Sequence, residues 1–262
     1  MAGRRRTLVL SAALLACAGF APLALSDGPG TARVYGYAVE RILPHDPTSF
    51  TEGLAYHDGS MIESSGLSTR SFLRRTTVRG RIMRQVAVPR AWAEGATVLG
   101  RRVFQLTYTE HKALVYDVRT FKLLRTLHYA GEGWGLASDG SRLIMSNGSA
   151  VLTFRDPSNF AARGTLPVVD GGQPVSGLNE LEVVRGAICA NVYPTDRIAC
   201  IDARSGRVRY WIDLTGLLPS RLRSDEQADL NGIAYDAKRS RLFVTGKFWP
   251  RVYQIRLAPL PG

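Results

Sequence analysis

The chain has little of several residue types on which common catalytic sites depend. It contains four histidines in 262 residues, and no two form a His-x-His or His-x-x-x-His pair, so no zinc site is indicated. It has no glycine-rich phosphate loop, and no serine lies in a Gly-x-Ser-x-Gly turn. No stretch of note has helical periodicity. These absences argue against zinc enzymes, against hydrolases built on that serine turn and against a largely helical fold.

Lysine is also scarce. Four lysines stand beside thirty arginines, and the formal net charge is +12. Such a charge can indicate nucleic-acid binding, but the arginines are scattered through predicted turns and strand ends and form no stripe with interleaved aromatic residues. We therefore expect a basic surface and no nucleic-acid partner.

Long apolar runs are confined to the N-terminus. Residues 4–6 are arginines, residues 8–18 are mostly apolar, and Ala24-Leu25-Ser26 places small residues at a signal-peptidase site. Gly19 and Pro22 break the run, which is too short for a permanent membrane span. The pattern predicts an export signal over residues 1–26, a single domain over residues 27–262 and a periplasmic or secreted location. The segment ending at Cys17 also resembles a bacterial lipoprotein box, so a lipid on Cys17 is the one membrane contact that the sequence suggests.

Cysteine is nearly absent from the predicted domain, which has only Cys189 and Cys200. They lie in two strand-like runs, 187–192 and 197–202, separated by four residues. If this loop closes a hairpin, the two cysteines are opposite each other and close enough to bond. An exported protein would favour a disulfide, and two small buried thiols are the alternative.

What the chain does have is a repeated segment. Five similar stretches recur at intervals of about 38 to 52 residues, and each begins a repeat unit of short strands and turns. We call them the repeat segments; they are 50–54, 94–96, 132–134, 179–182 and 231–233. A period of this length with about four strands per unit is typical of a β-propeller. The sequence therefore predicts an all-β fold, a five-bladed β-propeller in which equivalent positions meet at one end of an axis.

The last repeat offers only three strands. The alternating run at residues 32–43 precedes the first repeat and can supply the fourth. We expect this N-terminal strand to close the last blade, because closure removes an exposed sheet edge. A short surface helix is expected over residues 220–229.

Acidic residues open four of the repeat segments. They are Glu52, Glu94, Glu132 and either Glu180 or Glu182. Carboxylates that converge on a narrow channel repel one another unless a structural cation such as Ca²⁺ or backbone amides compensate them. The simpler interpretation is that these side chains cap turns between blades.

Six stretches, in order, carry a more specific pattern. They are 44–54 with 62–66, 131–136, 178–182, 190–193, 230–235 and 243–250. Together they resemble the plant- and bacterial-type glutaminyl-peptide cyclotransferases (glutaminyl cyclases), and the resemblance runs from about Val34 to Leu257. That family is a five-bladed propeller.

The resemblance implies a reaction within one substrate. The α-amine of an N-terminal glutamine attacks its own side-chain carbonyl, ammonia leaves, and pyroglutamate forms. The expected partners are peptides or proteins with N-terminal glutamine, no cofactor is required, and we expect a monomer. Ring closure needs a folded substrate, a group that moves a proton, and stabilisation of the carbonyl oxygen.

Matching positions suggest which residues fill these roles. Glu63, with a raised pKa, is expected to move the proton, Asn179 to hold the substrate and Lys247 to stabilise the developing oxyanion. The expected substrate-binding residues are Phe50, Glu52, Tyr108, Trp134, Tyr193 and Trp249.

Four positions depart from the family pattern. Glu52 replaces a glutamine, Ile62 an aromatic residue, and Tyr108 and Tyr193 each a tryptophan. They keep open an alternative, a non-catalytic propeller that binds peptide N-termini or a protein partner, since fold alone does not decide function. A lactonase-like metal propeller is disfavoured by the five repeats.

Overall fold

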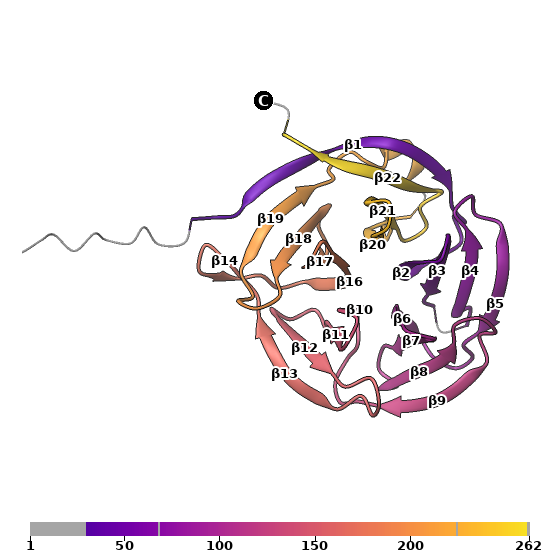
Figure 1. Cartoon of the computed structure of the whole chain (residues 1–262). Helices are drawn as coiled ribbons and strands as arrows, with labels where there is room; N and C mark the ends of the chain where they lie inside the picture. The colour runs from indigo at the N-terminus through magenta and orange to yellow at the C-terminus, as the bar shows by residue number, and fades with distance from the viewer. Residues whose placement is uncertain (1–29, 68, 224, 261–262) are drawn as a thin grey trace, which may run out of the picture.

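The structure, a computed structural model, describes residues 30–67, 69–223 and 225–260. The expected export signal, its cleavage point and Cys17 lie outside these residues. The described chain forms 22 strands and one short 3-10 helix, η1 (Ser220–Leu222), so the prediction of an all-β fold is confirmed. The strands stand in sheets around a common axis (Figure 1). No helix in the described ranges is long and apolar enough to cross a membrane.

Three sheets contain four antiparallel strands each, hydrogen-bonded in chain order. The first has β2 (Thr51–His57), β3 (Ser60–Ser65), β4 (Phe72–Thr77) and β5 (Ile82–Ala87). The second has β6 (Ala93–Leu99), β7 (Arg102–Thr107), β8 (Lys112–Asp117) and β9 (Leu123–His128). The third has β10 (Leu136–Ser138), β11 (Leu143–Met145), β12 (Val151–Arg155) and β13 (Ala162–Pro167). A small hairpin, β14 (Val169–Asp170) and β15 (Gln173–Pro174), follows the third sheet.

The remaining strands form one sheet of eight. Its order is β16 (Leu178–Val184), β17 (Ala187–Val192), β18 (Arg197–Asp202), β19 (Val208–Asp213), β1 (Arg33–Pro44), β22 (Arg251–Ala258), β21 (Arg241–Gly246) and β20 (Leu230–Asp236). The N-terminal strand β1 runs antiparallel to β22 from Gly36 to Pro44, as the sequence predicted. Its first residues also pair in parallel with β19, which was not expected. This second pairing is what joins the last two groups of four strands into one sheet.

Apolar residues fill the spaces between neighbouring sheets. Ile62 and Leu73 of the first sheet pack in one cluster with Val103 of the second. Similar clusters lie between each further pair of neighbours, including the last and the first. Burial of these faces therefore holds the sheets in a ring.

Glycines within the repeat segments, or directly after one, allow the innermost strands to touch. A Cβ atom on Gly53 would lie less than 3.0 Å from the backbone of β6, and one on Gly95 equally close to Leu136. On Gly135 it would meet the backbone of Asn179 and Glu180. Real Cβ atoms do not approach backbone so closely, and glycine alone removes the conflict. The repeat pattern thus has a structural cause, the contact of one inner strand with the next.

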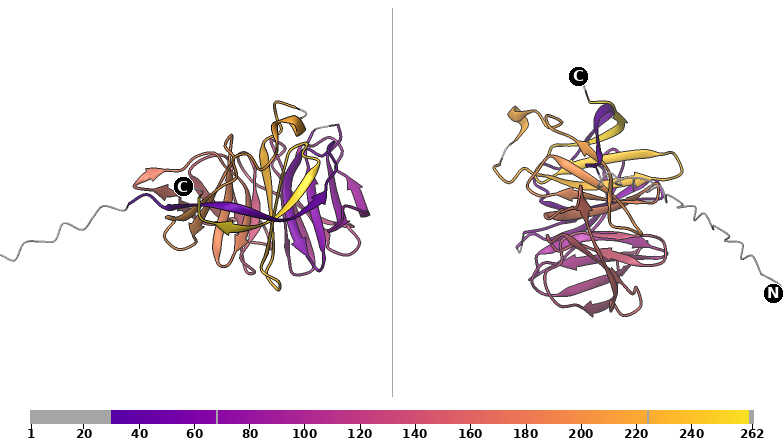
Figure 2. Two further views of the ribbon diagram at one scale, coloured as in Figure 1. Left: turned by 90° about the horizontal axis from the view of Figure 1, so that it is seen from above. Right: turned by 90° about the vertical axis from the view of Figure 1, so that its left-hand side faces the viewer.

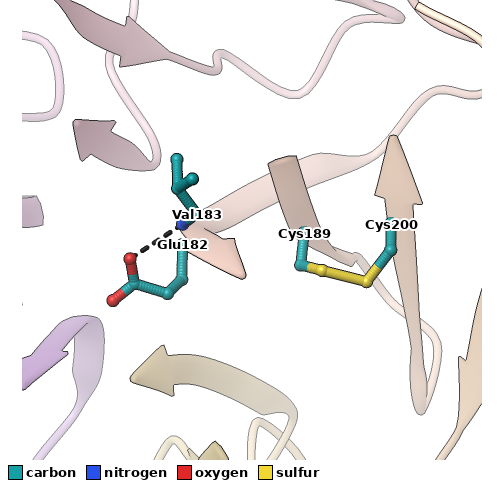
Figure 3. The surroundings of a disulfide bond; sticks show 4 residues. All are labelled: Glu182, Val183, Cys189 and Cys200. Atoms are coloured by element: carbon teal, nitrogen blue, oxygen red, sulfur yellow. Dashed lines mark hydrogen bonds between the residues drawn. A yellow bond between two sulfur atoms is a disulfide. The ribbon is translucent and has the colours of Figure 1, made fainter. Parts of the chain in front are cut away.

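The hairpin of β17 and β18 holds the disulfide. Cys189 is directly opposite Cys200 in the register, and their sulfur atoms are bonded (Figure 3). Of the two alternatives left open by the sequence, the structure has the disulfide. Both cysteines are fully buried.

The helix expected over residues 220–229 is present only as the single turn of η1. Its N-terminal cap position is Pro219, and no side chain caps the turn. This segment projects from one end of the ring (Figure 2), and that end carries the candidate site.

Candidate active site

A cavity of about 380 Å³ opens at the end of the ring where the repeat segments begin. Its walls come from every sheet, because each inner strand starts there. It is lined by Phe50, Glu52, Trp92, Glu94, Tyr108, Trp134, Asn179, Tyr193, Gln227 and Lys247. Seven of the nine residues that the sequence suggested are among them. Glu63 and Trp249 are the two exceptions.

A buried ion pair lies in this cavity. Lys247 Nζ is 3.0 Å from a carboxylate oxygen of Glu52, and the side-chain amide of Asn231 donates to the other oxygen over 2.9 Å. The ammonium of Lys247 also lies 4.4 Å from the centre of the Phe50 ring. Burial raises the pKa of Glu52, and the charge of Lys247 acts in the opposite direction. The pair fixes the ammonium of Lys247 in the wall of the cavity.

Glu94 is the second carboxylate of the cavity. It is the second residue of β6 and is only 6 % exposed. Burial raises its pKa well above the ordinary value, and the negative charge of Glu52 raises it further, against the attraction of Lys247. A carboxylic acid with a raised pKa can take up and return a proton near neutral pH. Glu94 therefore has the raised pKa that we expected at Glu63.

Glu63 has a different environment. It lies on β3 outside the cavity, with one oxygen 2.9 Å from His45 Nε2 and the other 2.7 Å from the Arg74 guanidinium. Burial alone would raise its pKa, but the charges and hydrogen bonds of His45 and Arg74 lower it to about 2. The expectation of a raised pKa at Glu63 is wrong, because two cationic partners hold the carboxylate ionised.

Trp249 also lies outside the cavity. Its indole is 1 % exposed, donates to the carbonyl of Ala228 over 3.0 Å and packs edge-on against Tyr253. It belongs to the apolar cluster between the last two groups of strands. The expected role in substrate binding is therefore not supported, and Trp249 is a core residue.

The aromatic walls of the cavity make contact with one another. Phe50 packs edge-on against Trp92, with ring centres 5.6 Å apart, and Trp134 packs against Tyr193 at 6.2 Å. Trp92 and Gln227 were not predicted. Trp92 could have been found from its place two residues before Glu94, just as Phe50 stands two residues before Glu52.

Asn179 has an unusual side chain. It is 5 % exposed, and its side-chain oxygen has no hydrogen-bond partner among the described residues. Its backbone is fixed, because its carbonyl accepts from the Ser146 hydroxyl over 2.6 Å. A buried polar atom without a partner is costly. Because Asn179 lines the cavity, its side-chain amide is placed to contact a bound amine or amide.

The acidic residues of the repeat segments do not share one role. The carboxylate of Glu180 accepts the backbone amides of Leu54, at 3.1 Å, and Ile233, at 2.7 Å. It therefore lies between three inner strands, and backbone amides compensate its carboxylate. This is one of the two ways of compensation that we considered from the sequence, the other being a structural cation. Burial raises the pKa of Glu182 to about 8, and its side chain accepts from the amide of Val183 (Figure 3). Across the described ranges, no group of three or more His, Cys, Asp and Glu could hold a metal ion.

Comparisons with known proteins identify the family. The family model described as Glutamine cyclotransferase matches residues 9–257. The chain belongs to the glutamine cyclotransferase family. The glutaminyl-peptide cyclotransferase of Arabidopsis thaliana is 38 % identical over 220 residues, which cover 82 % of this chain and 69 % of that protein. The crystal structure of Myxococcus xanthus glutaminyl cyclase matches with a TM-score of 0.83 and 34 % identity, over 88 % of this chain and 100 % of that one.

Proposed function

We propose that this protein converts the N-terminal glutamine of peptides or proteins to pyroglutamate and releases ammonia. Family membership supports the reaction. The roles of the residues are assigned from the position of Glu94. It is a buried carboxylate with a raised pKa, and it lies in an aromatic cavity together with Lys247 and Asn179.

Glu94 moves the proton. The substrate's α-amine nitrogen forms a bond to the side-chain carbonyl carbon, and one amine proton passes to the ionised Glu94 carboxylate. The carbonyl oxygen becomes an oxyanion. When the carbonyl re-forms, the bond to the amide nitrogen breaks, and Glu94 returns its proton to that nitrogen, which leaves as ammonia. Such proton transfer contributes roughly 10²- to 10⁴-fold to the rate.

The other cavity residues hold the reacting groups. Lys247 places its charge where the oxyanion develops, which stabilises the transition state more than the ground state. The side-chain amide of Asn179, which lines the cavity, hydrogen-bonds the substrate. Trp92, Trp134 and Phe50 confine the side chain in the folded shape that ring closure needs. Glu52 keeps Lys247 in place through the 3.0 Å ion pair.

The architecture and location belong to the same proposal. The arrangement of sheets supports a five-bladed β-propeller in which β1 closes the last blade, within a single domain over residues 27–262. We expect an export signal over residues 1–26 and a periplasmic or secreted monomer, with membrane attachment only through a lipid on Cys17. The disulfide supports export, because such bonds persist in oxidising compartments. No cofactor is required for the chemistry above, and a Ca²⁺ ion in the central channel would have a structural role only.

Ammonia release from a peptide with N-terminal glutamine tests the proposal. We expect the wild-type chain to turn over in EDTA and Glu94→Gln to lose at least about 100-fold in kcat. Glu40→Gln is the matched control, because Glu40 is exposed on the outer strand β1. Peptide binding without turnover in the wild type would instead establish the non-catalytic alternative, and full activity of Glu94→Gln would refute the assigned role.

A further inference from the structure

The buried cluster around Glu63 lies between two segments that carry cavity residues. Four charged groups form it: Glu63, His45, Arg74 and Asp46. The side chains of the first three are between 4 % and 7 % exposed. Arg74 bridges the two carboxylates at 2.7 Å and 2.8 Å, and the Thr51 hydroxyl donates to Glu63 over 2.8 Å. The roles proposed above make no use of this cluster.

His45 connects the cluster to the chain around Lys247. Its Nε2 faces Glu63 and its Nδ1 faces the backbone carbonyl of Trp249. The same segments are joined by two backbone bonds, from the amide of His45 to the carbonyl of Pro250 at 3.0 Å and from the amide of Phe248 to the carbonyl of Ser49 at 2.8 Å. Residues 45–50 end in Phe50 and residues 247–250 begin with Lys247. Both of these side chains line the cavity.

The protonation of His45 decides how many of these bonds exist. An imidazolium donates from both nitrogens, to the carboxylate and to the carbonyl, whereas a neutral imidazole donates from one. The charged groups that face it are Glu63 on β3 and Arg74 on β4. With His45 protonated, two carboxylates are balanced by two cations. With His45 neutral, the four groups keep one excess negative charge, which the 38 % exposed side chain of Asp46 places partly in solvent. Burial lowers the pKa of His45, but Glu63 and the Trp249 carbonyl outweigh this and raise it above 6.5.

We propose that Glu63 and His45 are positioning residues, which hold Lys247 and Phe50 in their places through the bridge from the Glu63 carboxylate across the His45 imidazole to the Trp249 carbonyl. The inference rests on the function proposed above. Loss of the proton from His45 breaks one end of the bridge and releases the segment that carries Lys247. Because Lys247 acts on the oxyanion, its displacement lowers kcat. The two backbone bonds still join the segments and limit the shift of Phe50, so KM changes less than kcat.

The pH dependence of kcat tests the proposal in the wild type and in Glu63→Gln. The wild type should lose activity above the pKa of His45. Glu63→Gln removes the anion that raises this pKa, so the alkaline limb should move to lower pH, while kcat falls about 10- to 100-fold near neutral pH. The acidic limb, which reports Glu94, should stay in place. A loss of stability alone would lower activity without moving the alkaline limb.

A measurement without any substitution complements this test. The ¹⁵N shifts of the His45 ring in the wild type should show the imidazolium at pH 6.5, with a titration midpoint that matches the alkaline limb of kcat. A neutral ring at pH 6.5, or an alkaline limb that does not move in Glu63→Gln, would overturn the inference while the wild type remains an active cyclase. A wild type without turnover would overturn the proposed function and, with it, this inference.

Discussion

Reduction of the disulfide between Cys189 and Cys200 should lower stability by an amount that the chain separation sets. The two residues are 11 apart in sequence. The loop-closure model assigns such a cross-link an unfolded-state entropy loss of about 9 cal/mol/K, which is about 2.8 kcal/mol at 25 °C. For a domain of about 230 residues, this corresponds to a fall in Tm of about 6 °C.

Chemical denaturation of the oxidised and the reduced wild type measures the contribution of the cross-link directly. Both forms keep the same side chains, so the difference in their free energies of unfolding comes from the bond alone. The double variant Cys189→Ala/Cys200→Ala should lose more, since alanine also leaves space at two positions that are 0–1 % exposed. Neither cysteine lines the cavity, so kcat should be unchanged at temperatures where the reduced protein is folded. A stability difference below about 1 kcal/mol between oxidised and reduced wild type would contradict the reasoning, because the loop would then not be restrained by the bond.

Three further predictions concern the carboxylates of Glu63 and Glu52 and the close contact at Gly135. The folded pKa of Glu63, about 2, is below its ordinary 4.5, so its contribution to stability is complete above pH 4.5 and is lost as the pH falls toward 2. Over that range, urea titrations should show the free energy of unfolding falling by about 3 kcal/mol more in the wild type than in Glu63→Gln, and parallel curves would exclude the lowered pKa. Glu52→Gln removes a negative charge that raises the pKa of Glu94, so the acidic limb of kcat should move to lower pH; an unmoved limb would show that the two carboxylates do not interact. Gly135→Ala places a methyl group against the backbone of Asn179 and should cost about 2 kcal/mol or more and raise KM, whereas Gly30→Ala, in open space, should change neither stability nor KM.

Much of the fold could be read from the sequence because it repeats. Alternating residues and turns located most strands, and the hairpin spacing placed Cys189 opposite Cys200. The run before the first repeat was expected to pair with the last repeat, which has only three strands of its own. This run is β1, and it does pair with β22. The parallel pairing of β1 with β19 was not foreseen, because it depends on where the first residues of the long strand β1 lie in space before the strand pairs with β22.

The site was predicted less completely, for a geometric reason. Seven cavity residues were found through the family resemblance. Four of them stand at or near the start of an inner strand, and Tyr108, Tyr193 and Lys247 directly follow the second strand of a group. Glu63 matched a recognisable sequence, but it lies on the second strand of its sheet, where His45 and Arg74 approach it. Glu94 was visible as the counterpart of Glu52, and its repeat position placed it at the cavity. Which carboxylate is paired with a cation is decided by residues from other strands, and no local pattern contains that information.

The close contacts at Gly53, Gly95 and Gly135 also limit what can enter the protein. The inner strands touch below the cavity, and Glu180 lies between three of them, bonded to two of their amides. The side of the cavity that faces these strands is closed to a polypeptide, so a peptide approaches Glu94 from the open end of the cavity. The packing of the inner strands thus fixes the direction from which a substrate enters.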